Sequence, residues 1–325
     1  MGVSVKLNTA LKLTLLLWIG LTAGARIEGK SYSITASDGV KLHVEVAGKG
    51  GACIFVQAGQ GSMSFREMGI KALEKHFTMI YMDRRGSGRS ASASDYSLDR
   101  MASDLDEIRE HLGYPKITVL AHSLGGVIAL RYARNYPDHI SHLIMANVTL
   151  HLLNDAMLRE QIKFLSPEHS DYLGSLQAIK GDELRKLARH VRSDSAIGYR
   201  ILTDNLRTIK KMNRLYERSA GNQDFTKLLT AEPSTLSEYY ADYSEDTRLI
   251  KIPTLLIAGT RDYAVGVNHH LRFRFPNHFL KVIPGGHLPY ADDREAFVES
   301  ITGFLGSGPV PQVRTSKSWG KGTKK

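Results

Sequence analysis

Three nearly continuous runs of hydrophobic residues lie in the first half of the chain, at 53–56, 79–82 and 117–121. Strands without alternation between polar and apolar positions are typical of a sheet covered on both faces, and such sheets are usually parallel. Before them, residues 32–35 and 40–46 flank a Ser37-Asp38-Gly39 turn, and the second stretch alternates, which predicts a hairpin. The pattern therefore predicts an α/β fold with an antiparallel start and a mostly parallel central sheet.

Hydrophobic residues at helical spacing separate these strand candidates. They recur every three or four positions from Leu98 to Leu112, with Ser97 placed to cap the N-terminus and Gly113 directly after the end. A second helix is predicted over 125–136, before Pro137. The remaining core elements are predicted as strands at 142–146, 254–258 and 279–283 and a helix over 294–305.

Residues 151–245 interrupt this alternation of strands and helices. They contain few strand-like runs, many helical ones and a mixture of charges throughout. We therefore expect an inserted helical segment between two parts of one core. The predicted division is a signal peptide over 1–25, core over 26–150, helical insertion over 151–245, core over 246–305 and a disordered basic tail over 306–325.

The N-terminal segment is predicted to be an export signal. Lys6 and Lys12 precede a mostly apolar run, and Ala23-Gly24-Ala25 provides the small residues of a cleavage site. Leu13 to Ala25 spans 13 residues, whereas a helix that crosses a membrane needs about 20. We expect cleavage near Arg26 and a secreted or periplasmic protein without stable membrane insertion. A retained anchor and a buried helix are the alternatives.

Charge and cysteine content exclude several classes of function. The formal net charge is +10, but the two end segments carry most of it and leave +3 for residues 26–305. An excess this small does not indicate a face that binds nucleic acid. The single cysteine, Cys53, cannot form an internal disulfide or a cysteine cluster for a metal. We expect no metal and no cofactor.

The strongest motif is Ala121-His122-Ser123-Leu124-Gly125-Gly126, between a predicted strand and a predicted helix. Its pattern is typical of a nucleophile elbow, in which a sharp turn exposes a serine above the sheet and small neighbours let strand and helix approach closely. Ala121 stands where the first glycine of that motif is usual. We predict that Ser123 is a nucleophile.

A serine nucleophile requires a base and an acid that orients the base. Asp262 and His287 each follow a predicted strand, and the order serine, aspartate, histidine is the one that this architecture uses. His269, His270 and His278 compete less well for the base, and Asn147 and Asp246 for the acid. We predict a catalytic triad of Ser123, Asp262 and His287.

An oxyanion hole is predicted from two backbone amides. The loop after the strand at 53–56 is rich in glycine, which permits close approach of its backbone to a ligand. The amide after a nucleophile lies at the start of the following helix, where donors are free. We nominate the N–H groups of Gly59 and Leu124 as the oxyanion donors.

Over residues 31–305 the chain resembles the α/β-hydrolase superfamily. Asp83-Arg84-Arg85-Gly86-Ser87-Gly88-Arg89-Ser90 is similar to the D-x-R-G-x-G-x-S turn of many members, where its role is mainly architectural. The resemblance implies the α/β-hydrolase fold, with residues 151–245 as a helical cap over the active site. The turn and the glycine-rich loop are most similar to proline iminopeptidase-like aminopeptidases, which usually show H-G-G-P-G where this chain has Gln57-Ala58-Gly59-Gln60-Gly61.

We therefore expect a serine hydrolase that cleaves a small ester or amide, or a short peptide, through an acyl-enzyme. An aminopeptidase would need carboxylates in the cap to receive the free amine of the substrate, and the sequence offers Glu217, Glu232, Glu238 and Asp242. A carboxylesterase or lipase, an acyl transferase and a silent binding protein on the same fold are the alternatives.

Overall fold

The structure is a computed structural model that describes residues 29–57, 61–166, 176–193, 197–218, 221–231 and 234–306. The predicted signal peptide, the predicted tail after Gly306 and Gly59 of the predicted oxyanion hole lie outside the described residues. Within the described ranges, no helix combines the length and the apolar character needed to cross a bilayer.

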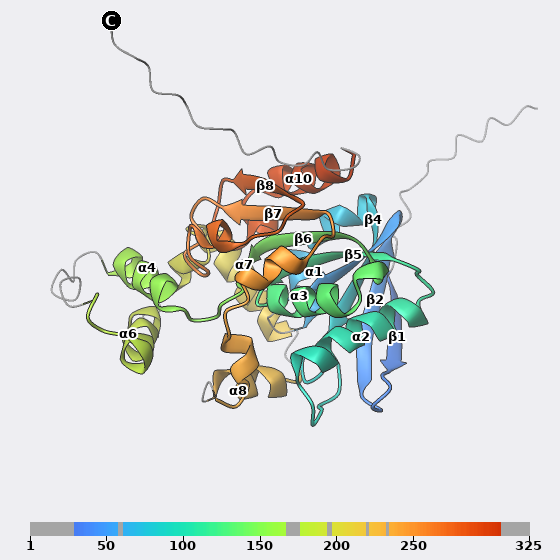
Figure 1. Cartoon of the computed structure of the whole chain (residues 1–325), viewed down its shortest axis with the longest axis horizontal. Helices are drawn as coiled ribbons and strands as arrows, with labels where there is room; N and C mark the ends of the chain where they lie inside the picture. The colour runs from blue at the N-terminus through green and yellow to red at the C-terminus, as the bar shows by residue number, and fades with distance from the viewer. Residues whose placement is uncertain are drawn as a thin grey trace, which may run out of the picture.

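An eight-stranded sheet forms the centre of the molecule (Figure 1). Its strands are β1 (Lys30–Thr35), β2 (Lys41–Gly48), β3 (Gly51–Val56), β4 (Phe77–Asp83), β5 (Ile117–Ser123), β6 (Ile140–Val148), β7 (Thr254–Gly259) and β8 (His278–Ile283). Their order across the sheet is β1-β2-β4-β3-β5-β6-β7-β8. β2 pairs antiparallel with β1 and β4, and β3 to β8 run parallel. The predicted mostly parallel sheet is confirmed.

The turns and caps read from the sequence form as expected. In the hairpin between β1 and β2, Gly39 has a φ of 86°, a conformation that glycine adopts without a steric penalty. At the start of α2 (Leu98–His111), the Ser97 Oγ accepts a hydrogen bond from the Arg100 N–H at 3.3 Å. At its end, the Gly113 N–H bonds the Glu110 carbonyl at 2.9 Å, which satisfies a terminal carbonyl of the helix.

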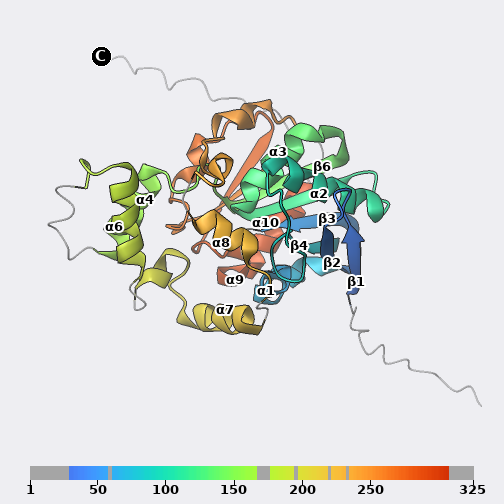
Figure 2. The ribbon, with the colours of Figure 1, turned by 90° about the horizontal axis from the view of Figure 1, so that it is seen from below.

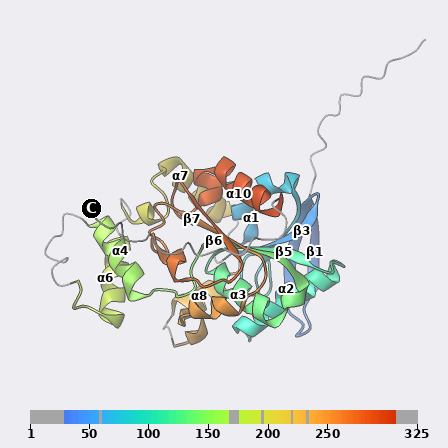
Figure 3. The same cartoon turned by 45° about the horizontal axis from the view of Figure 1, so that its top comes forward.

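Helices cover both faces of the sheet. They are α1 (Ser62–Met68), α2 (Leu98–His111), α3 (Gly125–Asn135), α4 (Asp155–Leu165), α6 (Gly181–Ser193), α7 (Leu206–Arg218), α8 (Asp224–Thr230), α9 (Pro289–Asp292) and α10 (Arg294–Gly306). Short 3₁₀ turns are η1 (Ile70–Lys75), η2 (Pro137–His139), η3 (Gly198–Ile201), η4 (Ser237–Tyr240), η5 (Glu245–Leu249) and η6 (His269–Arg272). α2 and α3 pack on one face, and α1 and α10 pack on the other (Figure 3). Because helices cover both faces of the sheet, the central strands are apolar at successive positions rather than at alternate ones.

All described elements between β6 and β7 are helical, and we call this stretch the insertion. α4 and α6 pack on each other around a small separate core that includes Leu158 and Leu184, and they project from one end of the sheet (Figure 1). α7 returns to the main core beside α1, where Ile209 and Met212 are buried (Figure 2). Phe225 of α8 packs against Tyr239 in the core on the opposite face. The insertion is therefore anchored on both sides of the sheet.

The turn after β4, from Asp83 to Ser90, is an architectural element. Arg85 is fully buried, and its guanidinium donates to both carboxylate oxygens of Asp104 at 2.7 Å and to Asp38 at 2.7 Å. Backbone hydrogen bonds join Gly88 of the turn to Asn222 of the insertion. The turn thus connects β4, α2, the first hairpin and the insertion.

Replacing Asp104 with asparagine is expected to lower the free energy of unfolding by about 3–5 kcal/mol, because it leaves the buried Arg85 guanidinium without its main countercharge. Urea unfolding at pH 7 measures the change. Asp99→Asn on the same helix removes an exposed ion pair with Arg131 and should cost less than about 1 kcal/mol. Equal losses in the two variants would contradict this assignment.

Candidate active site

β5 ends at Ser123 in a strained turn. The Ser123 φ is 57°, in the left-handed region that a residue with a side chain adopts at a cost of about 1–3 kcal/mol. A Cβ on Gly125 would lie 2.2 Å from the Val56 carbonyl oxygen of β3, so only glycine permits this approach of α3 to the sheet. The predicted elbow geometry is present, and it leaves Ser123 partly exposed at the carboxyl end of the sheet.

The three predicted triad side chains meet at this point. His287 Nε2 lies 3.0 Å from the Ser123 Oγ. On the other side of the ring, His287 Nδ1 lies 3.0 Å from Oδ2 and 3.1 Å from Oδ1 of Asp262. Asp262 is fully buried and His287 is 5% exposed. The Ser123 contact allows a proton to pass between the hydroxyl and the imidazole, and the Asp262 contact can orient the ring.

Backbone donors hold the Asp262 carboxylate from behind. Its Oδ1 accepts hydrogen bonds from the N–H groups of Ala264 at 3.1 Å and Val265 at 3.3 Å. The residue follows β7 through a short turn, in which the Asp262 N–H bonds the Gly259 carbonyl. These backbone hydrogen bonds fix the position of the carboxylate independently of its contact with the imidazole.

Asn147 is a buried residue that links two turns of this site, a role that the sequence analysis did not assign to it. Its Nδ2 donates to the Gly286 carbonyl at 2.7 Å, and its Oδ1 accepts from the Gly259 N–H at 2.8 Å. The side chain thus joins the end of β7 to the turn before His287. Its φ is 46°, which asparagine tolerates better than most residues, and its place at the end of β6 was the available signal.

The insertion also contacts the site directly. The His287 N–H donates to the Leu202 carbonyl at 2.7 Å. Next to it, the Thr203 Oγ donates at 2.8 Å to Asp292, which also accepts from the Gly286 N–H at 2.8 Å. Residues 202 and 203 of the insertion therefore help to hold the turn that carries the histidine.

α4 reaches the loop after Asp262. The Gln161 Nε2 donates to the Ala264 carbonyl at 3.0 Å, and the Glu160 carboxylate accepts from the Val267 N–H at 3.0 Å. The ring of Phe164 stacks on Tyr263 with 3.8 Å between centroids. The insertion thus packs against the turns that carry both the aspartate and the histidine.

Three of the competing residues have other partners. His269 donates from Nδ1 to the Gly266 carbonyl, His278 Nδ1 lies 2.6 Å from the Phe275 carbonyl, and Asp246 pairs with Arg134. Among the described residues, the side chain that shares a hydrogen bond with the Ser123 hydroxyl is His287. Leu124 stands as N-cap of α3, where the first N–H groups of a helix are free of intrahelical partners.

Two histidines beside the site are held neutral by burial. It lowers the pKa of His122 to about 3 and the pKa of His269 to about 4. Each unfolded imidazole binds a proton below about pH 6.5, while the folded one stays neutral. The free energy of unfolding should therefore decrease as the pH is lowered from about 6.5 towards these folded-state pKa values. The decrease should be about 1.4 kcal/mol per pH unit for each histidine.

Urea unfolding at about pH 7, 6 and 5 measures this dependence. His269→Gln removes one of the two groups, so its unfolding free energy should change less steeply between pH 6.5 and 4 than that of the wild type. Identical slopes in the two proteins would show that His269 already takes up its proton in the folded state.

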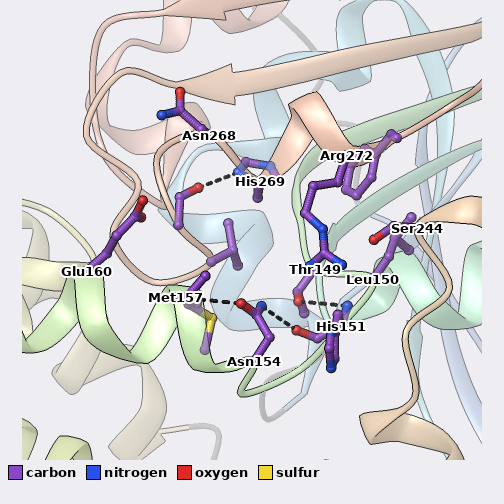
Figure 4. Close-up of a pocket in the computed structure, with 14 residues that line it drawn as sticks. Thr149, Leu150, His151, Asn154, Met157, Glu160, Ser244, Asn268, His269 and Arg272 are labelled. Carbon is purple, nitrogen blue, oxygen red and sulfur yellow. Dashed lines mark hydrogen bonds between the residues drawn. The ribbon is translucent and has the colours of Figure 1, made fainter. Parts of the chain in front are cut away.

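A cavity of about 240 Å³ lies next to the triad, between α4, the segment after β6 and the segment after β7 (Figure 4). His269 and Arg272 line it from one side, and Asn154 and Glu160 from the other. It adjoins the site through Thr149, whose N–H donates to the Ser123 carbonyl at 3.1 Å. Ser123 and His287 do not line it, so this cavity is adjacent to the site rather than part of it.

The carboxylates proposed to receive a substrate amine are mostly engaged by the protein. The Glu238 carboxylate accepts from the Leu98 N–H at 2.9 Å at the start of α2. Asp242 pairs with Arg272 and accepts from the Ser244 N–H. Glu217 is exposed on α7, and Glu232 lies outside the described residues. No group of three metal-ligating side chains occurs in the part of the chain that the structure describes.

Comparison with known proteins identifies related sequences. A relative from Caulobacter segnis, provisionally named as the carbamate hydrolase RutD, is 32% identical over 272 residues, which cover 75% of this chain and 87% of the relative. A protein of Bacillus subtilis, provisionally named as a 2-succinyl-6-hydroxy-2,4-cyclohexadiene-1-carboxylate synthase, is 25% identical and covers 85% of this chain and 99% of its own length.

Solved structures share the fold. A proline iminopeptidase-related protein from Thermus thermophilus superimposes with a TM-score of 0.64 at 22% identity, covering 86% of this chain and 98% of the other. A meta-cleavage product hydrolase from Pseudomonas fluorescens has a TM-score of 0.63 at 18% identity, covering 86% and 97%. The sequence model for the alpha/beta hydrolase fold matches residues 53–293. The chain therefore belongs to the α/β-hydrolase fold family.

Proposed function

We propose that this α/β-hydrolase is a serine hydrolase that cleaves a small ester or amide through an acyl-enzyme. Ser123 attacks the carbonyl carbon of the substrate. His287 takes the hydroxyl proton and returns it to the leaving group, while Asp262 fixes the imidazole tautomer. Water, activated by the same histidine, then releases the acid.

The single observation that carries this proposal is the chain of contacts from Asp262 through His287 to Ser123, with 3.0 Å at each link. Hydrogen-bonded nucleophile, base and orienting acid are what such catalysis needs, and the strained φ of Ser123 exposes its hydroxyl. The backbone N–H of Leu124, at the N-terminus of α3, is the proposed oxyanion donor, together with that of Gly59.

Esters and simple amides fit this chain better than peptides with a free amino terminus. Recognition of an α-ammonium requires a carboxylate without a stronger partner, and Glu238 and Asp242 already serve α2 and Arg272. We propose that the insertion acts as a cap, because Leu202 and Gln161 place it on the turns that carry the triad.

A fluorophosphonate probe tests the proposed nucleophile, because such probes phosphorylate an activated serine. The wild-type protein should be labelled stoichiometrically, and Ser123→Ala should not be labelled. Ser141→Ala is the matched control, since Ser141 lies on β6 and its Oγ contacts Thr118. Labelling that survives the replacement of Ser123 would contradict the proposal.

Relative rates then assign the substrate class. Short-chain aryl esters should be turned over faster than proline arylamides. The reverse order would favour an aminopeptidase, and an acylated alcohol or amine among the products would indicate acyl transfer.

A further inference from the structure

His122, the residue before the nucleophile, packs directly against His287. It is 2% exposed. Its Nε2 donates a hydrogen bond of 2.7 Å to the backbone carbonyl of His287. The two imidazole rings lie 4.6 Å apart at their centroids, with 43° between their planes.

The surroundings of His122 fix its proton. A carbonyl oxygen only accepts, so Nε2 must carry the hydrogen. The other ring nitrogen, Nδ1, has no hydrogen-bond partner among the described residues. The centroid of the His122 ring lies 5.9 Å from that of the Phe65 ring and 5.2 Å from that of the Tyr290 ring. A second proton would be buried without an acceptor, and this is unfavourable.

The titratable groups that face His122 are His287, Asp262 and Tyr290. Asp262 favours a charge on His122, whereas His287 and burial oppose it, and burial is the largest effect. Burial also raises the pKa of Tyr290, so its phenol stays neutral. Because its pKa is lowered to about 3, His122 presents an uncharged ring to His287 near neutral pH.

We propose that His122 is a positioning residue for His287, one that holds the backbone of the base through Nε2–H and supports the imidazolium with a neutral ring. This inference rests on the proposed function, because it requires His287 to act as the base. It adds a role for the residue between the first small residue of the elbow and the nucleophile.

The geometry shows why such a support matters. The backbone of His287 is held on one side by the Leu202 carbonyl and on the other by His122. The Nε2 to Ser123 contact is 3.0 Å, and a shift of about 1 Å in a reacting group can cost about 100-fold in rate. Loss of one of the two anchors would let the ring move away from both Ser123 and Asp262.

Two substitutions separate the hydrogen bond from simple packing. His122→Phe keeps an aromatic ring but has no donor, and His122→Gln keeps a donor but has no ring. Aryl-ester hydrolysis by His122→Phe is expected to show a kcat about 10- to 100-fold below wild type, with KM changed less than about twofold. His122→Gln should recover most of that loss. His142→Gln on β6, which packs on Phe304, is the control and should keep wild-type kcat.

The pH profile provides a readout that a packing defect would not move. A looser contact between His287 and Asp262 stabilises the imidazolium less, so the acid limb of kcat/KM should shift to lower pH in His122→Phe. It should stay near its wild-type position in His122→Gln. Equal losses of kcat in both variants, or unshifted acid limbs, would overturn the proposal.

A measurement on the unmodified protein covers the case in which His122→Phe does not fold. In ¹⁵N-histidine spectra, His122 should remain in the Nε2–H tautomer without titrating between pH 5 and 8. A titrating or Nδ1–H His122 would overturn the inference. Failure of the proposed function would look different, because hydrolysis would then persist in Ser123→Ala whatever the state of His122.

Discussion

Ser123→Ala is expected to lower kcat for aryl-ester hydrolysis by up to about 10⁶-fold, the size of the loss when the nucleophile of a serine protease is removed. In the proposed mechanism, the hydroxyl is the only part of the triad that forms a bond to the substrate. The remaining donors and binding contacts leave only a residual acceleration. Steady-state kinetics of the two proteins, compared at equal concentrations of folded protein, measure the change.

Folding must be separated from chemistry in this comparison. The thermal midpoint of Ser123→Ala should stay within a few degrees of wild type, because alanine keeps a Cβ at a position whose φ is 57° and removes only one hydroxyl. Ser141→Ala should retain wild-type kcat. Near-full turnover by folded Ser123→Ala would refute the nucleophile assignment.

Asp262→Asn is expected to lower kcat by about 10⁴-fold, as the equivalent change does in a serine protease through the wrong imidazole tautomer. Asp262 is fully buried, its Oδ1 accepts from two backbone N–H groups, and its Oδ2 lies 3.0 Å from His287 Nδ1. An amide offers one acceptor oxygen. If that oxygen keeps the backbone donors, the amide NH₂ faces Nδ1 and favours a proton on Nε2, where a base must be free.

Kinetics as a function of pH distinguish this outcome from a folding defect. The loss of kcat should persist at every pH where the variant is folded. Asp246→Asn is the control, since that carboxylate pairs with Arg134 on the surface, and its kcat should equal the wild-type value. A large loss in Asp246→Asn, or none in Asp262→Asn, would contradict the placement of the acid.

The sheet and the convergence of the triad residues could be predicted because local patterns determine them. Unalternating runs mark strands buried on both faces, and the ends of parallel strands meet at one edge of a sheet. Ser123, Asp262 and His287 each follow or end a strand that the hydrophobic pattern locates. Their meeting point therefore follows from topology, without knowledge of individual contacts.

The supporting contacts could not be predicted, because they join residues far apart in sequence. The Asn147 amide bridges Gly259 and Gly286, and the sequence shows only an asparagine near a strand end. The contact of His287 with Leu202 depends on where the insertion returns to the sheet. Alternation patterns carry no information about such returns, and the short helices α1 and α9 were also not anticipated.

The Leu202 carbonyl has a consequence for any change in substrate range. One of the two hydrogen bonds that hold the backbone of His287, the base of the proposed reaction, comes from Leu202 of the insertion. A change in the insertion that alters substrate access can therefore also alter turnover. Displacing residues 202 and 203 to admit a bulkier molecule would also loosen the position of the His287 imidazole. Redesign of this enzyme for new substrates should therefore begin at α6 and leave residues 202 and 203 unchanged.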